Sequence, residues 1–495
     1  MAAARPLKMA LRDNEQVVTY GELDAAADRL AARLVEAGAT TGTHVVLMAD
    51  NSAGYLAAAT AIWRAGSVLV TLYASSGPAE VSYVLENSGA SLIVADQRAK
   101  AVIDELPDAP PVLVIDPAEV FAGAPSLVEL AALPDPDPEK LALICYTSGS
   151  TARPKAVMHS HAGLLAGAEA YAAVWHITAT ERTIVCLPMA WAFGLVTTSM
   201  ATLIRAGEVI VLPRTKPEMI IDAVSRLRGT FLAGVTTMFV KLTEYLDTLA
   251  ERPDMGSLRL CISGGEPRNE TVFARWTDFT GCPVHDVYAA SECFPAVTYD
   301  PVQDPVPVLG SSGRVAPGSR MRVVDADGND VPAGAVGEAQ WKGPAHFLGY
   351  WKDPELTNKV LTEDGWYRTS DLVRVDQDGY VFVEGRISDM IIRGGSNVSP
   401  AEVEAVLAQH PSVRSVSVVG LPDLQYGEQV VAAIVPRGGD LPATDELRAF
   451  CAQRLAGYKI PTAFVALEAF PINARTEKVD RKALKQLLLQ EGAVA

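Results

Sequence analysis

The stretch YTSGSTARPK, residues 146–155, carries four serine and threonine hydroxyls and a glycine before it ends in a lysine. The apolar run LALICYT leads into it and predicts a strand, and a helix is expected from about His161. A loop between a strand and a helix can hold phosphate with backbone N–H groups, hydroxyls and an ammonium group. It is not a Walker loop, which needs Gly directly before the Lys. Since a polar surface loop has the same composition, a phosphate site is indicated only together with further motifs.

Short apolar runs alternate with helical patterns on both sides of this loop, up to about residue 290. This alternation predicts an α/β fold of parallel sheets covered by helices. Because ligands of such sheets lie at the carboxyl ends of the strands, the loops after residues 146, 187, 235, 263 and 288 are the expected site. The expected strands are residues 44–48, 67–71, 91–95, 112–115, 141–146, 183–187, 208–212, 231–235, 258–263 and 284–288. The expected helices include residues 23–34, 217–228, 238–249 and 269–279.

The pattern changes after residue 305. Gly and Pro become frequent up to residue 385, and DADG (325–328) and DQDG (376–379) predict hairpin turns of an antiparallel, barrel-like subdomain. After Arg386 a smaller α+β unit is expected, with helices at 400–409 and 445–455 and strands near 413–419 and 429–435. We therefore predict a large N-terminal domain, residues 1–385, and a small C-terminal domain, residues 386–495.

The composition limits the class of protein. A chain of 495 residues is too long for one hydrophobic core, and its 49% apolar and 20% charged residues are typical of globular proteins. The net charge of −17 argues against a nucleic-acid or anionic-membrane partner, because both need a basic surface. We expect neither a transmembrane helix nor a secretory signal. The six cysteines form no CxxC pair and are expected to be reduced thiols of a cytoplasmic protein.

Six further segments follow the loop in a fixed order: SGGEP (263–267), YAASE (288–292), GEAQWKGP (337–344), WYRTSD (366–371), GRISDMIIRGGSNVSPAEVE (385–404) and EKVDR (477–481). Together with YTSGSTARPKAV (146–157) they resemble the ordered motifs of the adenylate-forming superfamily of AMP-dependent synthetases and ligases. That superfamily comprises acyl- and aryl-CoA synthetases, luciferases and the adenylation domains of peptide synthetases. The resemblance extends over nearly the whole chain, from VTYGELDAAADRLAARL (18–34) onward.

The resemblance implies a two-step reaction. A carboxylate attacks the α-phosphate of ATP, pyrophosphate leaves, and the acyl-adenylate then passes its acyl group to a thiol, most commonly that of coenzyme A. It also implies that the C-terminal domain is mobile and rotates between the steps about Ser388, where relatives carry Asp or Lys. The implied cofactors are ATP, Mg²⁺ and coenzyme A, and the implied partners are a small carboxylic acid and, for some members, a carrier protein.

The resemblance assigns roles to individual residues. Tyr288 would stack on adenine, Asp371 would accept hydrogen bonds from the ribose hydroxyls, and Arg386 would reach ribose or phosphate. The other implied nucleotide-binding residues are Thr147, Ser148, Gly149, Ser150, Thr151 and Lys155 for the β- and γ-phosphates, and Gly264, Gly265, Glu266 and Asp286 around the adenosine.

Three residues are implied to be catalytic. Ser291 would bind the α-phosphate, Glu292 would hold Mg²⁺, a cation that prefers carboxylate and phosphate oxygens, and Lys478 would bridge the attacking carboxylate and the α-phosphate. The reaction brings two anions together, so their charge must be offset and their approach aligned. Lysine, arginine and a metal ion would supply that positive charge within an acidic protein.

The acid would bind among side chains after the same strands. MAWAFGL (189–195) offers no aspartate for an α-ammonium group, which argues against an amino acid as substrate. Its two aromatic residues favour a short or aromatic acid, unless both are plain core. The expected pocket residues are Trp191, Phe193, Val235, Thr236, Ser263, Ala290 and Val297.

The chain also departs from the family pattern. Glycines of the family are replaced by Ala152, Ala156, Ala289, Ser370 and Glu477, and glycine is favoured where φ is positive or where backbone approaches a ligand closely. Two alternatives therefore stay open. One is adenylation with another outcome, such as carrier-protein loading, amide formation, or nitrite activation for diazotisation of an aryl amine. The other is a nucleotide-binding pseudoenzyme.

Overall fold

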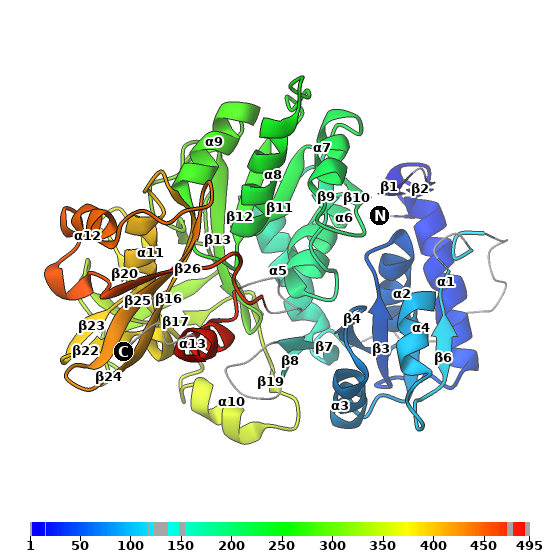
Figure 1. Ribbon diagram of the computed structural model, residues 1–495. Helices are drawn as coiled ribbons and strands as arrows, with labels where there is room; N and C mark the ends of the chain where they lie inside the picture. The colour runs from blue at the N-terminus through cyan, green and yellow to red at the C-terminus, as the bar shows by residue number, and fades with distance from the viewer. Residues whose placement is uncertain are drawn as a thin grey trace.

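The computed structural model describes residues 2–14, 16–116, 119–122, 137–147, 154–472 and 479–490 of the chain. Within these residues the strands form sheets of ten, seven, five and four strands, with helices packed over them (Figure 1). The predicted fold class, parallel sheets covered by helices followed by an antiparallel region and an α+β unit, is confirmed.

The seven-stranded sheet has the order β19-β8-β7-β4-β3-β5-β6. Its strands β3 to β7 run parallel, and β8 and β19, at one end of the sheet, are antiparallel to their neighbours. The strands are β3 (His44–Ala49), β4 (Val68–Tyr73), β5 (Leu92–Ala95), β6 (Val112–Val114), β7 (Leu141–Thr147), β8 (Lys155–Ser160) and β19 (Gly349–Tyr350).

The ten-stranded sheet has the order β15-β14-β13-β12-β11-β9-β10-β1-β2, with β18 also paired to β14. It is parallel from β13 to β1 and antiparallel beyond. The strands are β1 (Met9–Asp13), β2 (Gln16–Thr19), β9 (Arg182–Val185), β10 (Glu208–Val211), β11 (Phe231–Gly234), β12 (Leu260–Gly264), β13 (Val284–Ala290), β14 (Cys293–Thr298), β15 (Arg314–Val315) and β18 (Ala345–His346).

One hydrophobic core joins the two large sheets, since it contains Leu47 of β3, Leu232 of β11 and Trp175 between them. The first helix begins at a capping box in which the Thr19 hydroxyl and the Glu22 carboxylate satisfy each other's backbone N–H groups. The helices over these sheets are α1 (Tyr20–Glu36), α2 (Ala53–Arg64), α3 (Pro78–Ser88), α4 (Gln97–Ile103), α5 (His161–Val174), α6 (Ala201–Leu203), α7 (Pro217–Ser225), α8 (Thr236–Thr248), α9 (Glu270–Thr280) and α10 (Pro354–Val360).

The predicted antiparallel region is a four-stranded sheet of β16 (Arg320–Val324), β17 (Val336–Lys342), β20 (Tyr367–Val375) and β21 (Val381–Arg386). DQDG forms the turn between β20 and β21, where Asp376 accepts hydrogen bonds from the backbone of Asp378 and Tyr380. Side chains of this sheet share a core with β14 and with the segment around β19, so the antiparallel region closes around one set of apolar residues.

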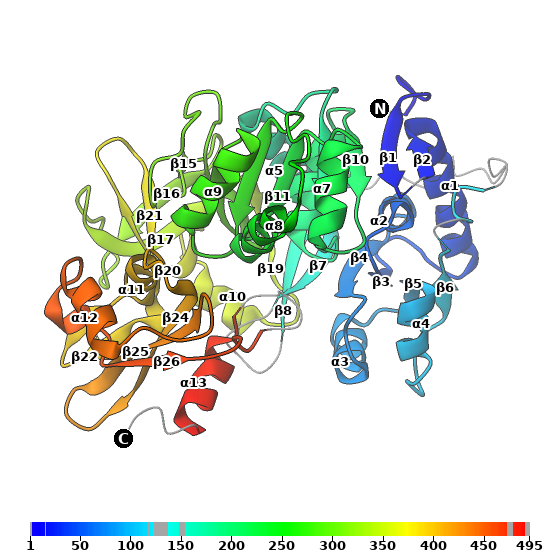
Figure 2. The same cartoon turned by 45° about the horizontal axis from the view of Figure 1, so that its top comes forward.

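The C-terminal unit forms the sheet β23-β22-β25-β24, with β26 beside β25. It lies next to the four-stranded sheet, where α11 packs against β21 (Figures 1 and 2). The predicted boundary at 386–389 falls on the short 3₁₀ helix η3 (Ile387–Asp389) and stays a prediction. The elements are β22 (Ile391–Arg393), β23 (Ser396–Val398), α11 (Pro400–Leu407), β24 (Val413–Asp423), β25 (Gly427–Pro436), α12 (Thr444–Ala452), η4 (Gly457–Lys459), β26 (Ala463–Ala466) and α13 (Arg481–Gln490).

Two local features differ from the prediction. The loop after β7 does not lead straight into α5, because β8 intervenes and pairs antiparallel with β7, with Thr147 opposite Lys155. The segment after Trp191 forms a π-helix, η2 (Phe193–Met200). π-Helical turns are rare and occur mostly at functional sites. Both elements contribute side chains to the candidate site.

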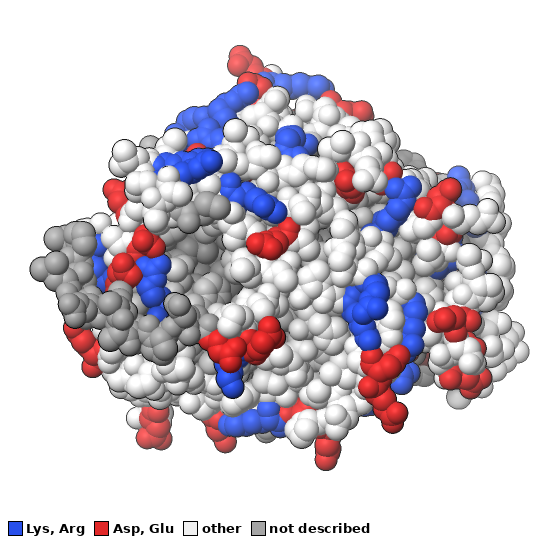
Figure 3. Space-filling model, turned by 180° about the vertical axis from the view of Figure 1, so that it is seen from behind, with Lys and Arg blue, Asp and Glu red and all other residues white. Residues whose placement is uncertain are grey.

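Basic and acidic side chains are interspersed over the face of the molecule seen in Figure 3. Among the described residues, no helix is both long and apolar enough to cross a membrane.

Candidate active site

The proposed adenosine residues meet where β12 and β13 end side by side, with Gly264 opposite Val287 in the sheet. The Tyr288 ring follows on β13 and makes an edge contact with Trp341 of β17 at 4.7 Å between centroids. A side chain at Gly264 would lie 2.8 Å from the Val287 carbonyl oxygen, so only glycine fits there. Gly265 has φ of +80°, a left-handed conformation that glycine adopts freely. This wall therefore depends on two glycines for its shape.

Asp371 on β20, the residue predicted to bind ribose, contacts both Tyr288, predicted to stack on adenine, and Arg386, predicted to reach ribose or phosphate. Its Oδ2 accepts a hydrogen bond from the Tyr288 hydroxyl at 2.5 Å, and its Oδ1 accepts one from Arg386 Nε at 3.0 Å. Burial raises the pKa of the Asp371 carboxyl, and the Arg386 guanidinium opposes that shift. One hydrogen-bonded group at the edge of the four-stranded sheet thus combines residues from three motifs: Asp371, Tyr288 and Arg386.

Glu292 and Lys155 are connected through Tyr350, which no motif singled out. The Tyr350 hydroxyl donates to Glu292 Oε1 at 2.6 Å, and Lys155 Nζ lies 5.4 Å from the centroid of the same ring. Glu292 is buried, with 7% of its surface exposed. The carboxylate proposed for metal and the ammonium proposed for phosphate are therefore held by one buried side chain.

Ser291 is held by the strand that follows the proposed phosphate loop. His159 on β8 donates from Nε2 to the Ser291 carbonyl at 2.6 Å. Burial lowers the pKa of His159 to about 4, so the ring is neutral at neutral pH and its Nε2 carries the donated proton. The Ser291–Glu292 backbone is also bound on the other side, because Phe347 N–H donates to the Glu292 carbonyl.

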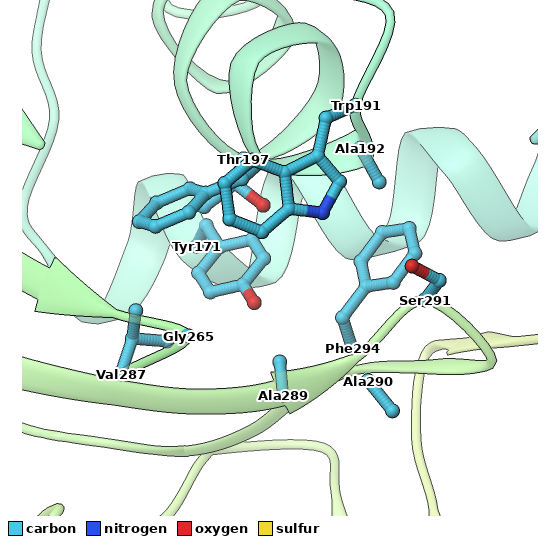
Figure 4. Close-up of a pocket in the computed structure, with 11 residues that line it drawn as sticks. Tyr171, Trp191, Ala192, Thr197, Gly265, Val287, Ala289, Ala290, Ser291 and Phe294 are labelled. Carbon is cyan, nitrogen blue, oxygen red and sulfur yellow. The ribbon is translucent and has the colours of Figure 1, made fainter. Parts of the chain in front are cut away.

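A cavity of about 60 Å³ opens between η2, α5 and the end of β13. Trp191 covers one side of it, and the Tyr171 hydroxyl points toward the strand that carries Ala289 (Figure 4). The described residues of its wall include the hydroxyl groups of Thr197 and Ser291, and none of them is Asp, Glu, Lys or Arg. The lining residues are Tyr171, Trp191, Ala192, Phe193, Thr197, Gly265, Val287, Ala289, Ala290, Ser291 and Phe294.

Three of the seven predicted pocket residues, Trp191, Phe193 and Ala290, line this cavity. The other four lie elsewhere among the described residues. Val235 packs in the main core, and Val297 packs in the core of the antiparallel region. Thr236 hydrogen-bonds to Ser263 and to the Pro267 carbonyl beneath the ends of β11 and β12.

Two predicted adenosine residues make their contacts away from the cavity. Glu266 accepts hydrogen bonds from the backbone and hydroxyl of Thr237, at the start of α8. Asp286 is 4% exposed and accepts a hydrogen bond from Ser312, with Arg268 Nη1 3.9 Å away. Burial raises the pKa of Asp286 to about 7 despite that arginine. Asp286 thus belongs to a buried polar network behind Tyr288.

The predicted residues Ser148, Gly149, Ser150, Thr151 and Lys478 lie outside the described residues. Thr147 and Lys155 are described and form the last pair of the hairpin that carries the loop. Ser388, the predicted hinge, lies in η3 and donates a hydrogen bond to Asp389 at 3.1 Å.

The side chains around Glu292 fit a magnesium ion better than a metal ion whose ligands all come from the protein. Among the described residues, no group of three or more His, Cys, Asp or Glu could hold a metal ion. Mg²⁺ typically binds one or two carboxylates together with substrate phosphates and water. Glu292 provides one such carboxylate, with Oε1 bound to Tyr350 and no hydrogen-bond partner for Oε2 among the described residues.

Sequence reasoning missed Tyr350, His159, Tyr171, Thr197 and Phe294. Their positions depend on strand pairing and on the π-helix, which a motif does not record. A weak signal was available for His159, because the apolar run AVM beside it is typical of a buried strand.

Comparisons with known proteins agree with this geometry. The family described as AMP-binding enzyme matches residues 1–351, and the AMP-binding enzyme C-terminal domain matches residues 402–478. The chain is 33% identical to a feruloyl-CoA synthase of Amycolatopsis, over 95% of this chain and 94% of the relative. It is 32% identical to an indoleacetate–CoA ligase of Aromatoleum aromaticum, over 99% and 97%. The ATP-bound crystal structure of MatB from Rhodopseudomonas palustris superimposes with a TM-score of 0.88 at 30% identity, over 97% and 96% of the chains.

Proposed function

The chain belongs to the AMP-binding enzyme family as an AMP-forming acid–thiol ligase, and from this premise we propose that it adenylates an aryl acid and transfers the acyl group to coenzyme A. The observation that carries the choice of acid is the cavity beside Ser291, which has aromatic walls and, among the residues that the structure describes, no charged side chain.

The nucleotide would bind across the ends of β12 and β13. Tyr288 and the two glycines enclose adenine, and the carboxylate of Asp371 accepts hydrogen bonds from ribose once its bond with Tyr288 is exchanged. The charge of Arg386 opposes the rise in the pKa of that carboxyl that burial causes, which favours its role as an acceptor. Thr147, the loop after it and Lys155 would bind the β- and γ-phosphates.

Glu292 would hold Mg²⁺, which supplies positive charge to the phosphates when it is bound. Ser291 would donate a hydrogen bond to the α-phosphate, and its carbonyl is fixed by His159, so the hydroxyl is placed in advance. Lys478 would approach from the C-terminal domain, residues 386–495, which we propose turns about Ser388 between the two steps. Fixed donors and cations of this kind offset the repulsion between carboxylate and phosphate.

The acid pocket favours a flat, uncharged ring. Tyr171 and Phe294 lie nearly parallel, with 15° between the ring planes and 6.4 Å between centroids, and Trp191 meets Phe193 edge to face at 5.3 Å. A second carboxylate or a sulfonate would lose its hydration without gaining a cation. The named substrates of the two aryl-acid relatives, ferulate and indoleacetate, agree with this choice.

Acid-dependent exchange of labelled pyrophosphate into ATP tests the proposal. The panel contains benzoates and cinnamates, short aliphatic acids, malonate, sulfoacetate, a long-chain fatty acid and nitrite, each with and without coenzyme A. We expect exchange with aryl acids and formation of the aryl-CoA thioester on addition of coenzyme A. Exchange with malonate or sulfoacetate alone, or the absence of exchange with every acid, contradicts the proposal. Exchange with aryl acids but no thioester overturns only the choice of acceptor.

The Tyr171 hydroxyl gives a second test of the same pocket, because it lies at the cavity wall within hydrogen-bond reach of Thr197. We expect Tyr171→Phe to lower kcat/KM for ring-hydroxylated acids about fivefold, the equivalent of one hydrogen bond of about 1 kcal/mol. The unsubstituted acids should change less than twofold. An equal loss for both groups of acids contradicts a role for this hydroxyl in selecting the substrate.

A further inference from the structure

Tyr350 occupies the point where the proposed phosphate hairpin and the proposed metal carboxylate meet. Its side chain is 3% exposed and packs edge to face against Phe347 at 5.2 Å between centroids. Its hydroxyl donates to Glu292 Oε1 at 2.6 Å and is within hydrogen-bond reach of Tyr367. Burial raises the pKa of the Tyr350 hydroxyl, and the neighbouring Glu292 carboxylate raises it further, so the hydroxyl remains a donor.

The backbone around Tyr350 is fixed on both sides. Strand β19 pairs with β8, with Tyr350 opposite Val157, and Trp351 N–H donates to the Ala156 carbonyl at 2.8 Å. Three residues before Tyr350, Phe347 N–H donates to the Glu292 carbonyl at 2.8 Å. The segment thus binds the backbone of Glu292 through Phe347 and the carboxylate of Glu292 through Tyr350.

The same ring lies beside Lys155, whose Nζ is 5.4 Å from the ring centroid. An ammonium group near the face of a tyrosine ring is attracted by the π electrons, most strongly where water is excluded. Lys155 stands at the start of β8, directly beyond the loop proposed to bind phosphate. The Tyr350 side chain therefore contacts both the Glu292 carboxylate and the Lys155 ammonium group. The distance between these two groups would determine where a metal–phosphate complex binds.

We propose that Tyr350 is a positioning residue for the metal–triphosphate complex, an inference that rests on the proposed function. It acts in two separable ways. The hydroxyl fixes Glu292 through Oε1 and directs Oε2 to the metal, and the ring face directs Lys155 toward the phosphates. Partners that orient a metal ligand in this way commonly contribute 10-fold to 100-fold in metal affinity.

The test uses binding instead of turnover. Mn²⁺ replaces Mg²⁺, a non-hydrolysable ATP analogue replaces ATP, and bound Mn²⁺ is measured by its electron paramagnetic resonance signal. Affinity for the analogue is measured separately in EDTA. We expect Tyr350→Phe to weaken Mn²⁺ binding in the analogue complex by about 10-fold or more while affinity for the analogue in EDTA stays within twofold. Tyr350→Leu should also weaken binding of the analogue in EDTA, because the ring beside Lys155 is lost.

Tyr299→Phe is the matched control, since Tyr299 is also buried and its hydroxyl contacts Val308 and Ser311, neither of which belongs to the proposed metal or phosphate site. It should leave Mn²⁺ binding unchanged. In a Glu292→Gln background, Tyr350→Phe should have no further effect on Mn²⁺, because both act through one carboxylate. Mn²⁺ binding by Tyr350→Phe within twofold of the wild type overturns the proposal for Tyr350. A parallel loss of analogue affinity in EDTA, which indicates general damage, also counts against it. If the wild type does not bind the ATP analogue at all, that result contradicts the proposed function itself, on which the proposal for Tyr350 rests.

Discussion

At the scale of single residues, the resemblance implies glycine at several positions where this chain has other residues, and at Ser370 the structure shows the backbone conformation involved. Ser370 has φ of +60°, in the left-handed region that glycine adopts without strain. Its backbone N–H donates to Glu338 Oε1 at 3.2 Å, and its neighbour Asp371 binds Tyr288 and Arg386. The conformation is thus kept by the site around it, at a cost of about 1–2 kcal/mol.

Replacing this serine should therefore relieve strain. We expect Ser370→Gly to raise stability by up to about 1 kcal/mol, because the strain removed exceeds the added chain entropy of glycine. The midpoint of thermal unfolding, followed by circular dichroism, measures the effect. Ser225→Gly, at the end of α7, serves as the control and should lower stability by a similar amount. A lower midpoint for Ser370→Gly would show that the serine side chain contributes more than its backbone strain costs.

At the scale of elements, local patterns predicted most of the α/β strands within two residues of their observed bounds, because buried parallel strands are continuous apolar runs. Strand β8 was missed, since its pairing with β7 and β19 is set by partners far along the chain. The π-helix η2 was missed because π-helical turns are rare and no residue pattern used in the prediction distinguishes them from other helices. The motifs predicted separate roles in one nucleotide site for Asp371, Tyr288 and Arg386, but not the hydrogen bonds among them. The contacts of Tyr350 and His159 are revealed only by the folded chain.

The π-helix itself can be tested at Gly194. A side-chain carbon there would lie 2.3 Å from the Pro188 carbonyl oxygen, so either η2 or the preceding turn must move. We expect Gly194→Ala to cost about 1–3 kcal/mol of stability and to raise KM for the acid, because Phe193 and Thr197 would leave their places in the cavity wall. Gly457→Ala, which meets no atom within 4 Å, is the matched control and should leave both quantities nearly unchanged. Unaltered KM and stability in Gly194→Ala would contradict a fixed η2.

Strand β8 makes the site sensitive to acid through His159. In the folded protein the pKa of His159 is about 4, below the ordinary value of 6.5. As the pH falls, the unfolded chain therefore binds the proton before the folded protein does. The resulting stabilisation is complete above pH 6.5 and is lost as the pH falls through 4, with a total of about 3 kcal/mol. His159→Gln keeps a donor for the Ser291 carbonyl and removes this titration. We expect its thermal midpoint to fall less than that of the wild type between pH 7.5 and pH 4.5, and equal slopes would exclude His159 as the cause.

At the scale of the whole molecule, one ion pair connects the C-terminal sheet to the large N-terminal region. Arg414 on β24 binds Glu244 on α8 through two parallel hydrogen bonds, both of 2.7 Å. The two side chains are 47% and 37% exposed, so the pair contributes at most about 1 kcal/mol and is screened by salt. A contribution of that size is too small to lock two domains together. It is large enough to change the equilibrium constant between two domain arrangements of similar free energy about fivefold.

If the C-terminal domain turns between two steps, this pair should favour the arrangement seen here. We expect Arg414→Gln to reduce the population of this arrangement, measured by energy transfer between one fluorophore on α8 and another on α12. The wild type should approach the variant in 1 M salt, where surface charges are screened. Exchanging the charges in an Arg414→Glu and Glu244→Arg double variant should restore the wild-type distance, since the pair is remade with opposite orientation. A distance that neither Arg414→Gln nor salt alters would show that this ion pair does not set the domain arrangement, and would leave other contacts, such as those of α11 with β21, to set it.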